Sequence, residues 1–309
     1  MYDFKPEGSL LPSVQNMKVL SSPQLLKEAQ FSSMNLEGRV ILCDAKHNLH
    51  VDLGCMKGII PKEEGAMGIE NGKVRDIALI SRVNKAVIFK VTGFSVDDKT
   101  HETYAILSRK KVQEECQEKY LSKLIPGDII NACVTHIEPF GAFCDVGAGI
   151  SALLPIDSIS VSRIPHPNAR LKVGQNIRVI VKNIDSLGRL TLSHKELLGT
   201  WKENAKRFSV GETVPGIIRS VEKYGIFVEL TPNLAGLAEF CDDVNVGDHA
   251  SVYIKSILPD RMKIKLIIVD SFNADYPPSK PHYYVEENHI DSWIYSPENS
   301  DKFIETKFI

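Results

Sequence analysis

One segment occurs twice in this chain, and the repetition limits how the chain can fold. Residues 137–146 read IEPFGAFCDV, and residues 221–230 read VEKYGIFVEL. Each copy places an aromatic residue before a glycine and a phenylalanine two residues after it. Because side chains alternate across a strand, the apolar residues share one face and Phe143 and Phe227 point to the other. Exposed phenylalanines predict a surface on which another molecule is laid.

The same alternation assigns a carboxylate to each outer face. Asp145 follows Phe143 by two residues, and Glu229 follows Phe227 by two residues. Both carboxylates are therefore expected in solvent beside the phenylalanines.

A wider comparison of the chain with itself predicts three related units. They open with Gly38-Arg-Val, Gly127-Asp-Ile-Ile and Gly211-Glu-Thr-Val. In the second unit, five short β-rich runs are separated by turns, which is typical of a small barrel. These runs cover 127–137, 140–146, 152–156, 175–184 and 189–193. The fold class that follows is mainly β, with three tandem five-stranded barrels joined by short linker helices.

The segments between and beside these units differ in composition. Lys110–Leu124 and Thr200–Phe208 are rich in good helix formers, and Ser22 with Pro23 begins a short helix that runs to about Gln30. A helical or 3₁₀ stretch is expected within 157–171. Aromatic residues crowd the C-terminal segment, which is expected to fold back onto the third unit. The predicted organisation is an N-terminal extension (1–37), a divergent repeat (38–111), a linker helix (112–125), a repeat (126–199), a linker helix (200–210), a compact repeat (211–270) and a C-terminal extension (271–309).

Charge and motif content exclude several classes of function. The net charge of the 309 residues is −2, so no global excess of cations points to nucleic acid, and local faces must decide binding. The six cysteines form no C-x-x-C pair and are expected to be reduced thiols rather than zinc ligands. No phosphate loop, G-x-S-x-G or H-E-x-x-H motif occurs, so we expect no enzyme, no cofactor and no metal. Charged residues interrupt the N-terminus and no long apolar run occurs, which favours a cytoplasmic protein without a membrane partner.

Residues 127–199 carry a more specific pattern. They read G-D-x-x-x-x-x-V-x-x-I-x-x-F-G-A-F-x-D-V-G, followed by V-G-x-x-I-x-V-x-V-x-x-I-D-x-x-x-R-L-x-L-S. This pattern resembles an S1-type RNA-binding OB-fold. Three such units in tandem resemble the family of bacterial ribosomal protein S1 and its shorter relatives. The resemblance is strong over 127–199, good over 211–268 and weaker over 38–108.

The resemblance implies which residues contact RNA. In the second unit they are the stacking aromatics Phe140 and Phe143 with their polar partners Asp185 and Arg189. In the third unit Tyr224 and Phe227 match the aromatics, Lys263 takes the place of Arg189, and Asp260 is nearest to the aspartate position. A histidine that is usual on the third strand is replaced by Pro155 and by Glu239. The first unit has His47, His50 and Tyr104 at the corresponding positions.

Simple geometry sets one condition on the second unit. Phe140 and Phe143 are three residues apart, so a regular strand would place them on opposite faces. Both can touch one ligand only if Gly141 allows a bend or a bulge.

The function that follows is single-stranded RNA binding by stacking, in translation, with messenger RNA and the small ribosomal subunit as partners. Two alternatives stay open: a scaffold that docks proteins, and an accessory of an RNA-processing complex. The first unit can equally bind RNA or dock a protein, and the C-terminal extension has no assigned role.

Overall fold

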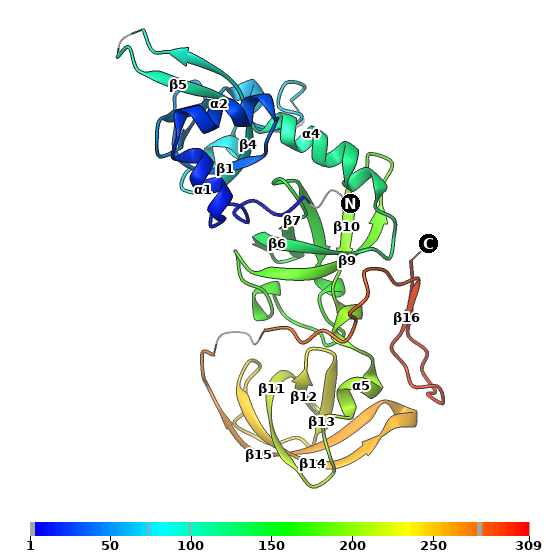
Figure 1. The fold of residues 1–309 in the computed structure, drawn as a ribbon. Coiled ribbons are helices and arrows are strands. Elements are labelled where there is room, and N and C mark those ends of the chain that lie inside the picture. The colour runs from blue at the N-terminus through cyan, green and yellow to red at the C-terminus, as the bar shows by residue number, and fades with distance from the viewer. Residues whose placement is uncertain (1–3, 73, 99, 277–279, 309) are drawn as a thin grey trace. The chain divides into compact units, whose positions relative to one another are not determined.

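The computed structural model describes residues 4–72, 74–98, 100–276 and 280–308 (Figure 1). The chain divides into two compact units. The first extends to Leu124 and includes Asp145–Ser151, and the second comprises Ile125–Cys144 and the residues from Ala152 onward.

Three closed barrels of five strands each make up most of the chain. The first is built from β1 (Leu36–Cys43), β2 (Leu49–Asp52), β3 (Lys57–Ile60), β4 (Ala86–Val96) and β5 (Thr103–Ser108). The second is built from β6 (Ile129–Glu138), β7 (Gly141–Asp145), β8 (Ser151–Pro155), β9 (Asn176–Ile184) and β10 (Leu190–Ser193). The third is built from β11 (Thr213–Glu222), β12 (Gly225–Thr231), β13 (Leu234–Ala238), β14 (His249–Leu258) and β15 (Lys263–Phe272).

All three barrels share one topology. The strands follow each other around the wall in the order first, second, third, fifth, fourth. The third and fifth strands run parallel, and the fourth closes against the first in an antiparallel pair. The mainly β fold with three five-stranded OB-type barrels is therefore confirmed, and the five strands predicted in the second barrel agree with the observed ones to within about two residues.

Helices occupy the connections. The linker between the first two barrels contains α4 (Lys110–Lys119) and the 3₁₀ turn η2 (Leu121–Lys123), and α5 (Trp201–Ala205) precedes the third barrel. Thr200 caps α5 through a reciprocal pair of hydrogen bonds with Glu203. The first barrel also carries η1 (Lys62–Glu64) and α3 (Ile77–Ile80), and the third carries η6 (Pro259–Arg261).

The N-terminal extension contains two helices rather than the single one expected. α2 (Pro23–Phe31) agrees with the prediction, and the Ser22 hydroxyl accepts a hydrogen bond from the backbone N–H of Leu25. α1 (Val14–Leu20) was not expected. Its cap residue Ser13 is followed by no proline and no capping-box acid, so the sequence signal at its start is weak.

The loop between the third and fourth strands distinguishes the second barrel from the third. It contains two 3₁₀ turns, η3 (Ile156–Ser158) and η4 (Pro167–Ala169), and η5 (Lys195–Leu198) follows the last strand. The corresponding described segment of the third barrel, residues 239–247, has no helical turn. A helical or 3₁₀ insertion in the second barrel was expected.

The C-terminal extension packs on both barrels of the second unit. Its strands β16 (Ser292–Ile294) and β17 (Glu305–Lys307) form a two-stranded sheet. Trp293 and Tyr295 belong to the core of the third barrel, as expected. Tyr283 and Phe308 pack instead with apolar residues of the second barrel and of η5, which was not expected.

The exact limits of the seven predicted segments remain a prediction.

Candidate nucleic-acid interface

The predicted aromatic pair of the second barrel lies together on the barrel surface. The ring centroids of Phe140 and Phe143 are 6.2 Å apart, with the planes at 88° in an edge-to-face arrangement. Phe140 is 55% exposed and Phe143 is half-buried. Phe140 belongs to the turn before β7, so the alternation along the strand does not apply to it.

Gly141 makes this turn possible. A Cβ atom at this position would lie 2.4 Å from the backbone oxygen of Leu154, because β7 approaches β8 closely there. Only glycine fits without a shift of backbone. The condition set by the sequence is therefore met at the start of the strand.

The third barrel repeats the arrangement. Tyr224 and Phe227 have ring centroids 6.2 Å apart and planes at 85°. Tyr224 is 71% exposed. Gly225 has a φ of +145°, and a Cβ there would lie 2.5 Å from the backbone oxygen of Ala238. The same turn, set by the same close approach, positions the aromatic pair twice.

A histidine that the sequence reasoning missed extends the platform of the second barrel. The ring of His136 stacks on Phe143 with centroids 6.4 Å apart and planes at 26°. Strict alternation would group His136 with Ala132 and Val134, which are buried. Its exposed ring shows that the alternation breaks before it. The third barrel has Ser220 opposite Phe227 in a register that shifts at this point, so its platform lacks this third ring.

Asp185 and Arg189 form an ion pair in the turn between β9 and β10. Arg189 Nε donates to Asp185 Oδ2 over 2.7 Å, and Asp185 Oδ1 accepts from the backbone N–H groups of Leu187 and Arg189 over 2.9 Å each. The hydrogen bonds that Asp185 accepts, first the one from the Arg189 backbone and then those from the Arg189 side chain and the Leu187 backbone, lower the pKa of Asp185 below its usual value. Arg189 is 75% exposed, so its terminal amino groups face solvent, where a phosphate or a base can reach them.

Strand register supports the match of Lys263 with Arg189. Thr191 pairs with Leu153 in the second barrel, and Lys265 pairs with Leu237 in the third. Arg189 lies two residues before Thr191, and Lys263 lies two residues before Lys265, so the two cations occupy equivalent positions. Lys263 is exposed and forms no ion pair within the described part of the chain. Asp260 lies in η6, and it forms no ion pair with Lys263 of the kind that Asp185 forms with Arg189.

The first barrel presents its corresponding residues differently. His47 Nδ1 lies 3.0 Å from Asp76 Oδ2, and the amino group of Lys62 lies 2.8 Å from the same oxygen. His50 Nε2 lies 3.4 Å from Asp44 Oδ2. Both histidines therefore already face carboxylates of their own barrel.

Tyr104 stands on β5 at the position of Arg189 and is half-buried. An aromatic ring there can pack against a base, but it supplies no cation for a phosphate. The role of the three first-barrel residues stays a prediction.

The two carboxylates expected in solvent are buried, which corrects the sequence-based prediction. Asp145 accepts hydrogen bonds from the backbone N–H groups of Glu7, Gly147 and Gly149, and burial raises its pKa to about 6. Glu229 forms ion pairs with the guanidinium groups of Arg170 and Arg219. The alternation rule correctly predicted that both side chains point away from the barrel cores. They are buried because other segments of the chain cover them.

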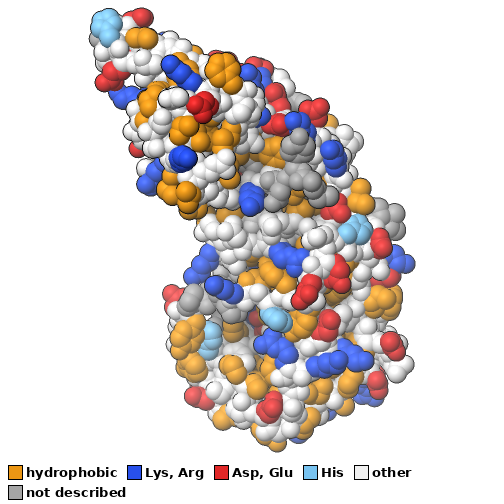
Figure 2. Space-filling model, viewed as in Figure 1, with side chains coloured by type: hydrophobic (Ala, Val, Ile, Leu, Met, Phe, Trp, Pro, Cys, Tyr) orange, Lys and Arg blue, Asp and Glu red, His pale blue; other side chains and the backbone are white. Residues whose placement is uncertain are grey.

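Charge on the visible face of the second unit is mixed. Figure 2 shows basic side chains interspersed with acidic ones, rather than one continuous basic surface. All six cysteines lie in the described part of the chain and none is in a disulfide; Cys116 and Cys144 are buried and the other four are half-buried. The described residues contain no cluster of His, Cys, Asp and Glu suited to a metal ion. None of the described helices is long and apolar enough to cross a membrane.

Comparison with known proteins identifies the class of domain. Residues 123–195 match the family model of the S1 RNA binding domain, so the second barrel is an S1 domain. Over 96% of its length the chain is 26% identical to small ribosomal subunit protein bS1 of Mycolicibacterium smegmatis, and covers 64% of that protein. Over 76% of its length it is 27% identical to bS1 of Staphylococcus aureus, and covers 58% of that protein. The chain is thus similar to bacterial ribosomal protein bS1, and it spans less than two thirds of the length of these relatives.

Among solved structures, a multidomain protein with nucleic acid binding domains from Streptococcus pneumoniae matches 77% of this chain and 74% of its own. The identity is 13% and the TM-score is 0.25.

Proposed function

We propose that this protein binds single-stranded RNA, without catalysis, in translation in the cytoplasm. Messenger RNA is the proposed ligand and the small ribosomal subunit the proposed assembly. The observation that carries the proposal is the repeated aromatic pair: two edge-to-face pairs with the same separation, one in each of two barrels, each with one exposed ring (Phe140, Tyr224) and one half-buried ring (Phe143, Phe227).

The proposed contacts divide into stacking and charge. Phe140, Phe143, Tyr224 and Phe227 offer faces to unpaired bases, each worth about 1–3 kcal/mol. Arg189, oriented by Asp185, and Lys263 neutralise phosphates beside the two aromatic pairs. Two weak modules on one chain raise the local concentration for each other, so the pair binds more tightly than either alone.

Replacing the two inner phenylalanines tests the proposal. Phe143→Ala combined with Phe227→Ala should weaken binding of an unstructured oligoribonucleotide by well over tenfold, since both substitutions remove a ring on which a base stacks. Fluorescence anisotropy of a labelled oligouridylate measures the affinity. Phe303→Ala, which removes an exposed ring elsewhere on the chain, is the matched control and should leave the affinity unchanged. Equal affinities for the double variant and the control would refute the stacking proposal.

A second candidate function is protein docking by the first unit. Its helices expose large apolar side chains, among them Val14 at 78% and Phe31 at 87%, and both histidines of its barrel already face carboxylates. A partner held by this surface should persist after ribonuclease treatment and be released by Phe31→Ser. A partner released by ribonuclease alone would favour RNA as the link.

A further inference from the structure

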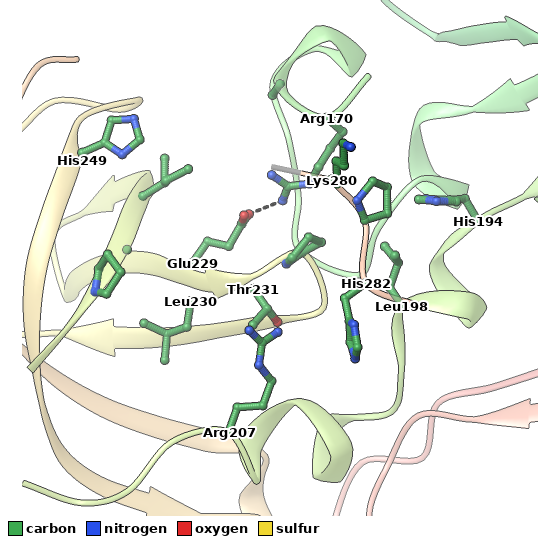
Figure 3. A pocket seen from close by; sticks show the side chains of 16 residues that line it. Arg170, His194, Leu198, Arg207, Glu229, Leu230, Thr231, His249, Lys280 and His282 are labelled. Carbon is green, nitrogen blue, oxygen red and sulfur yellow. Dashed lines mark hydrogen bonds and ion pairs between the residues drawn. The ribbon is translucent and has the colours of Figure 1, made fainter. Parts of the chain in front are cut away.

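A basic pocket lies within the second unit, beside the outer face of the third barrel. Its volume is about 390 Å³, within the range of roughly 300–1,000 Å³ that is common for ligand sites. The loop of the second barrel around η4, strands β11 and β12 of the third barrel, and residues 280–282 of the C-terminal extension line it (Figure 3).

Among the charged side chains that line the pocket, cations predominate. Arg170 enters from the second barrel, Arg207 from the segment after α5, and Lys280 from the C-terminal extension. His249 and His282 add further nitrogen atoms. Glu229 is the one carboxylate among the described lining residues.

The charge of Glu229 is already compensated twice. Arg170 Nη2 donates to Glu229 Oε2, and Arg219 donates from Nε and Nη2 over 2.8 and 3.2 Å. All three side chains are nearly buried, and the buried Nε of Arg170 has no hydrogen-bond acceptor. Two guanidinium groups on one carboxylate leave an excess positive charge in a place largely removed from water.

Two further cations are available to a ligand. Arg207 and Lys280 are exposed, and within the described part of the chain neither forms an ion pair. An unpaired arginine and lysine beside an over-compensated carboxylate make a site for an anion, and arginine in particular binds phosphate oxygens in a forked geometry.

The pocket continues the aromatic platform of the third barrel. Phe227 and Glu229 point to the same outer face of β12, because the residues that alternate with them, Ile226 and Val228, are buried in the core. Two residues along a strand span about 7 Å. A nucleic-acid strand that stacks a base on Phe227 can therefore carry a neighbouring phosphate to the mouth of the pocket.

We propose that this pocket binds a backbone phosphate of the single-stranded RNA whose base stacks on Phe227. The inference rests on the proposed function and adds a second kind of contact to it, at the junction of two barrels and the C-terminal extension. The same phosphate chemistry could be supplied by a mononucleotide or by inorganic phosphate, so the test must separate these sources from RNA.

The test compares two double variants of the full chain that change the net charge equally. Arg207→Gln with Lys280→Gln alters the pocket. Lys206→Gln with Lys302→Gln removes two exposed cations that do not line it. Binding of a labelled oligouridylate of about 16 nucleotides is measured by anisotropy between about 50 and 200 mM salt.

The pocket variant should bind about tenfold more weakly at low salt. Its plot of log affinity against log salt should be shallower by about 0.7 for each phosphate that the pocket no longer neutralises. The control should keep the slope and affinity of the unaltered protein. Equal behaviour of the two variants, with RNA binding still abolished by the phenylalanine substitutions, would overturn this inference and leave the proposed function standing.

Two other outcomes also overturn the inference. If the unaltered protein binds no RNA, the proposed function fails with it. If calorimetric titration with uridine monophosphate or inorganic phosphate shows tight binding that the pocket variant lacks, while RNA binding is unaffected, the pocket serves a small phosphorylated ligand instead.

Discussion

The buried carboxylate of the third barrel offers a quantitative test of what holds the second unit together. Glu229 is 4% exposed, and its partners Arg170 and Arg219 are 10% and 11% exposed. Glu229→Gln keeps the shape of the side chain but removes the one negative charge that the two guanidinium groups share. Removing one partner of a buried pair leaves an uncompensated charge and costs about 3–5 kcal/mol.

Urea unfolding followed by tryptophan fluorescence measures this cost. The chain has two tryptophans, Trp201 and Trp293, and both lie in the core of the third barrel, so the emission reports on that barrel. The midpoint should fall with the slope m unchanged.

An exposed ion pair of the same barrel supplies the control. Glu239 and Lys255 are 81% and 54% exposed, and their charged atoms lie 3.3 Å apart. Glu239→Gln should cost at most about 1 kcal/mol, because such a pair is screened by water. If the two glutamine variants lower the free energy of unfolding equally, the reasoning about the buried cluster is wrong.

Two further predictions concern acid stability and the turn before β7. Burial lowers the pKa of His194 from 6.5 to about 4, so the unfolded chain binds a proton that the folded chain excludes, and stability should fall by about 3 kcal/mol as the pH drops from 6.5 to 4. Urea midpoints at several pH values should show a weaker dependence for His194→Asn; an unchanged dependence would assign the effect to other groups. Gly141→Ala brings a Cβ within 2.4 Å of backbone and should lower the calorimetric melting temperature by several degrees, at a cost of about 1–3 kcal/mol. Gly93→Ala, whose Cβ would meet its nearest neighbour at 3.8 Å, should not, and equal melting temperatures would contradict the account of the turn.

The barrels and the aromatic pairs could be predicted from the sequence because local patterns determine them. Alternation of apolar residues marks the strands, and the glycine between the two aromatics marks the close approach of the neighbouring strand. Both signals lie within a few residues of the side chains that they position, as with Phe140, Gly141 and Phe143.

The surroundings of the outer faces could not be predicted in the same way. Asp145 is buried by the backbone of Glu7, and Glu229 by Arg170, which are 138 and 59 residues away along the chain. No local sequence pattern indicates contacts between residues so far apart along the chain. His136 was missed for the opposite reason, because a local break in alternation moved it from the core side to the exposed side.

The C-terminal extension shows the same limit. Its aromatic content indicated that it would pack on something, and Trp293 and Tyr295 do enter the third barrel's core. That Tyr283 would accept a hydrogen bond from the backbone of Arg178 in the second barrel depends on the path of the chain between the two. The described part of the extension leaves Tyr224 71% exposed, so it does not cover this ring.

The most direct test of the central claim is to map where RNA touches the protein. A single-stranded RNA carrying 4-thiouridine is crosslinked to the unaltered chain with ultraviolet light, and the modified peptides are identified by mass spectrometry. Stacking predicts crosslinks within 137–146 and 221–230, centred on Phe143 and Phe227. Crosslinks confined to other segments, with both aromatic pairs unmodified, would contradict it.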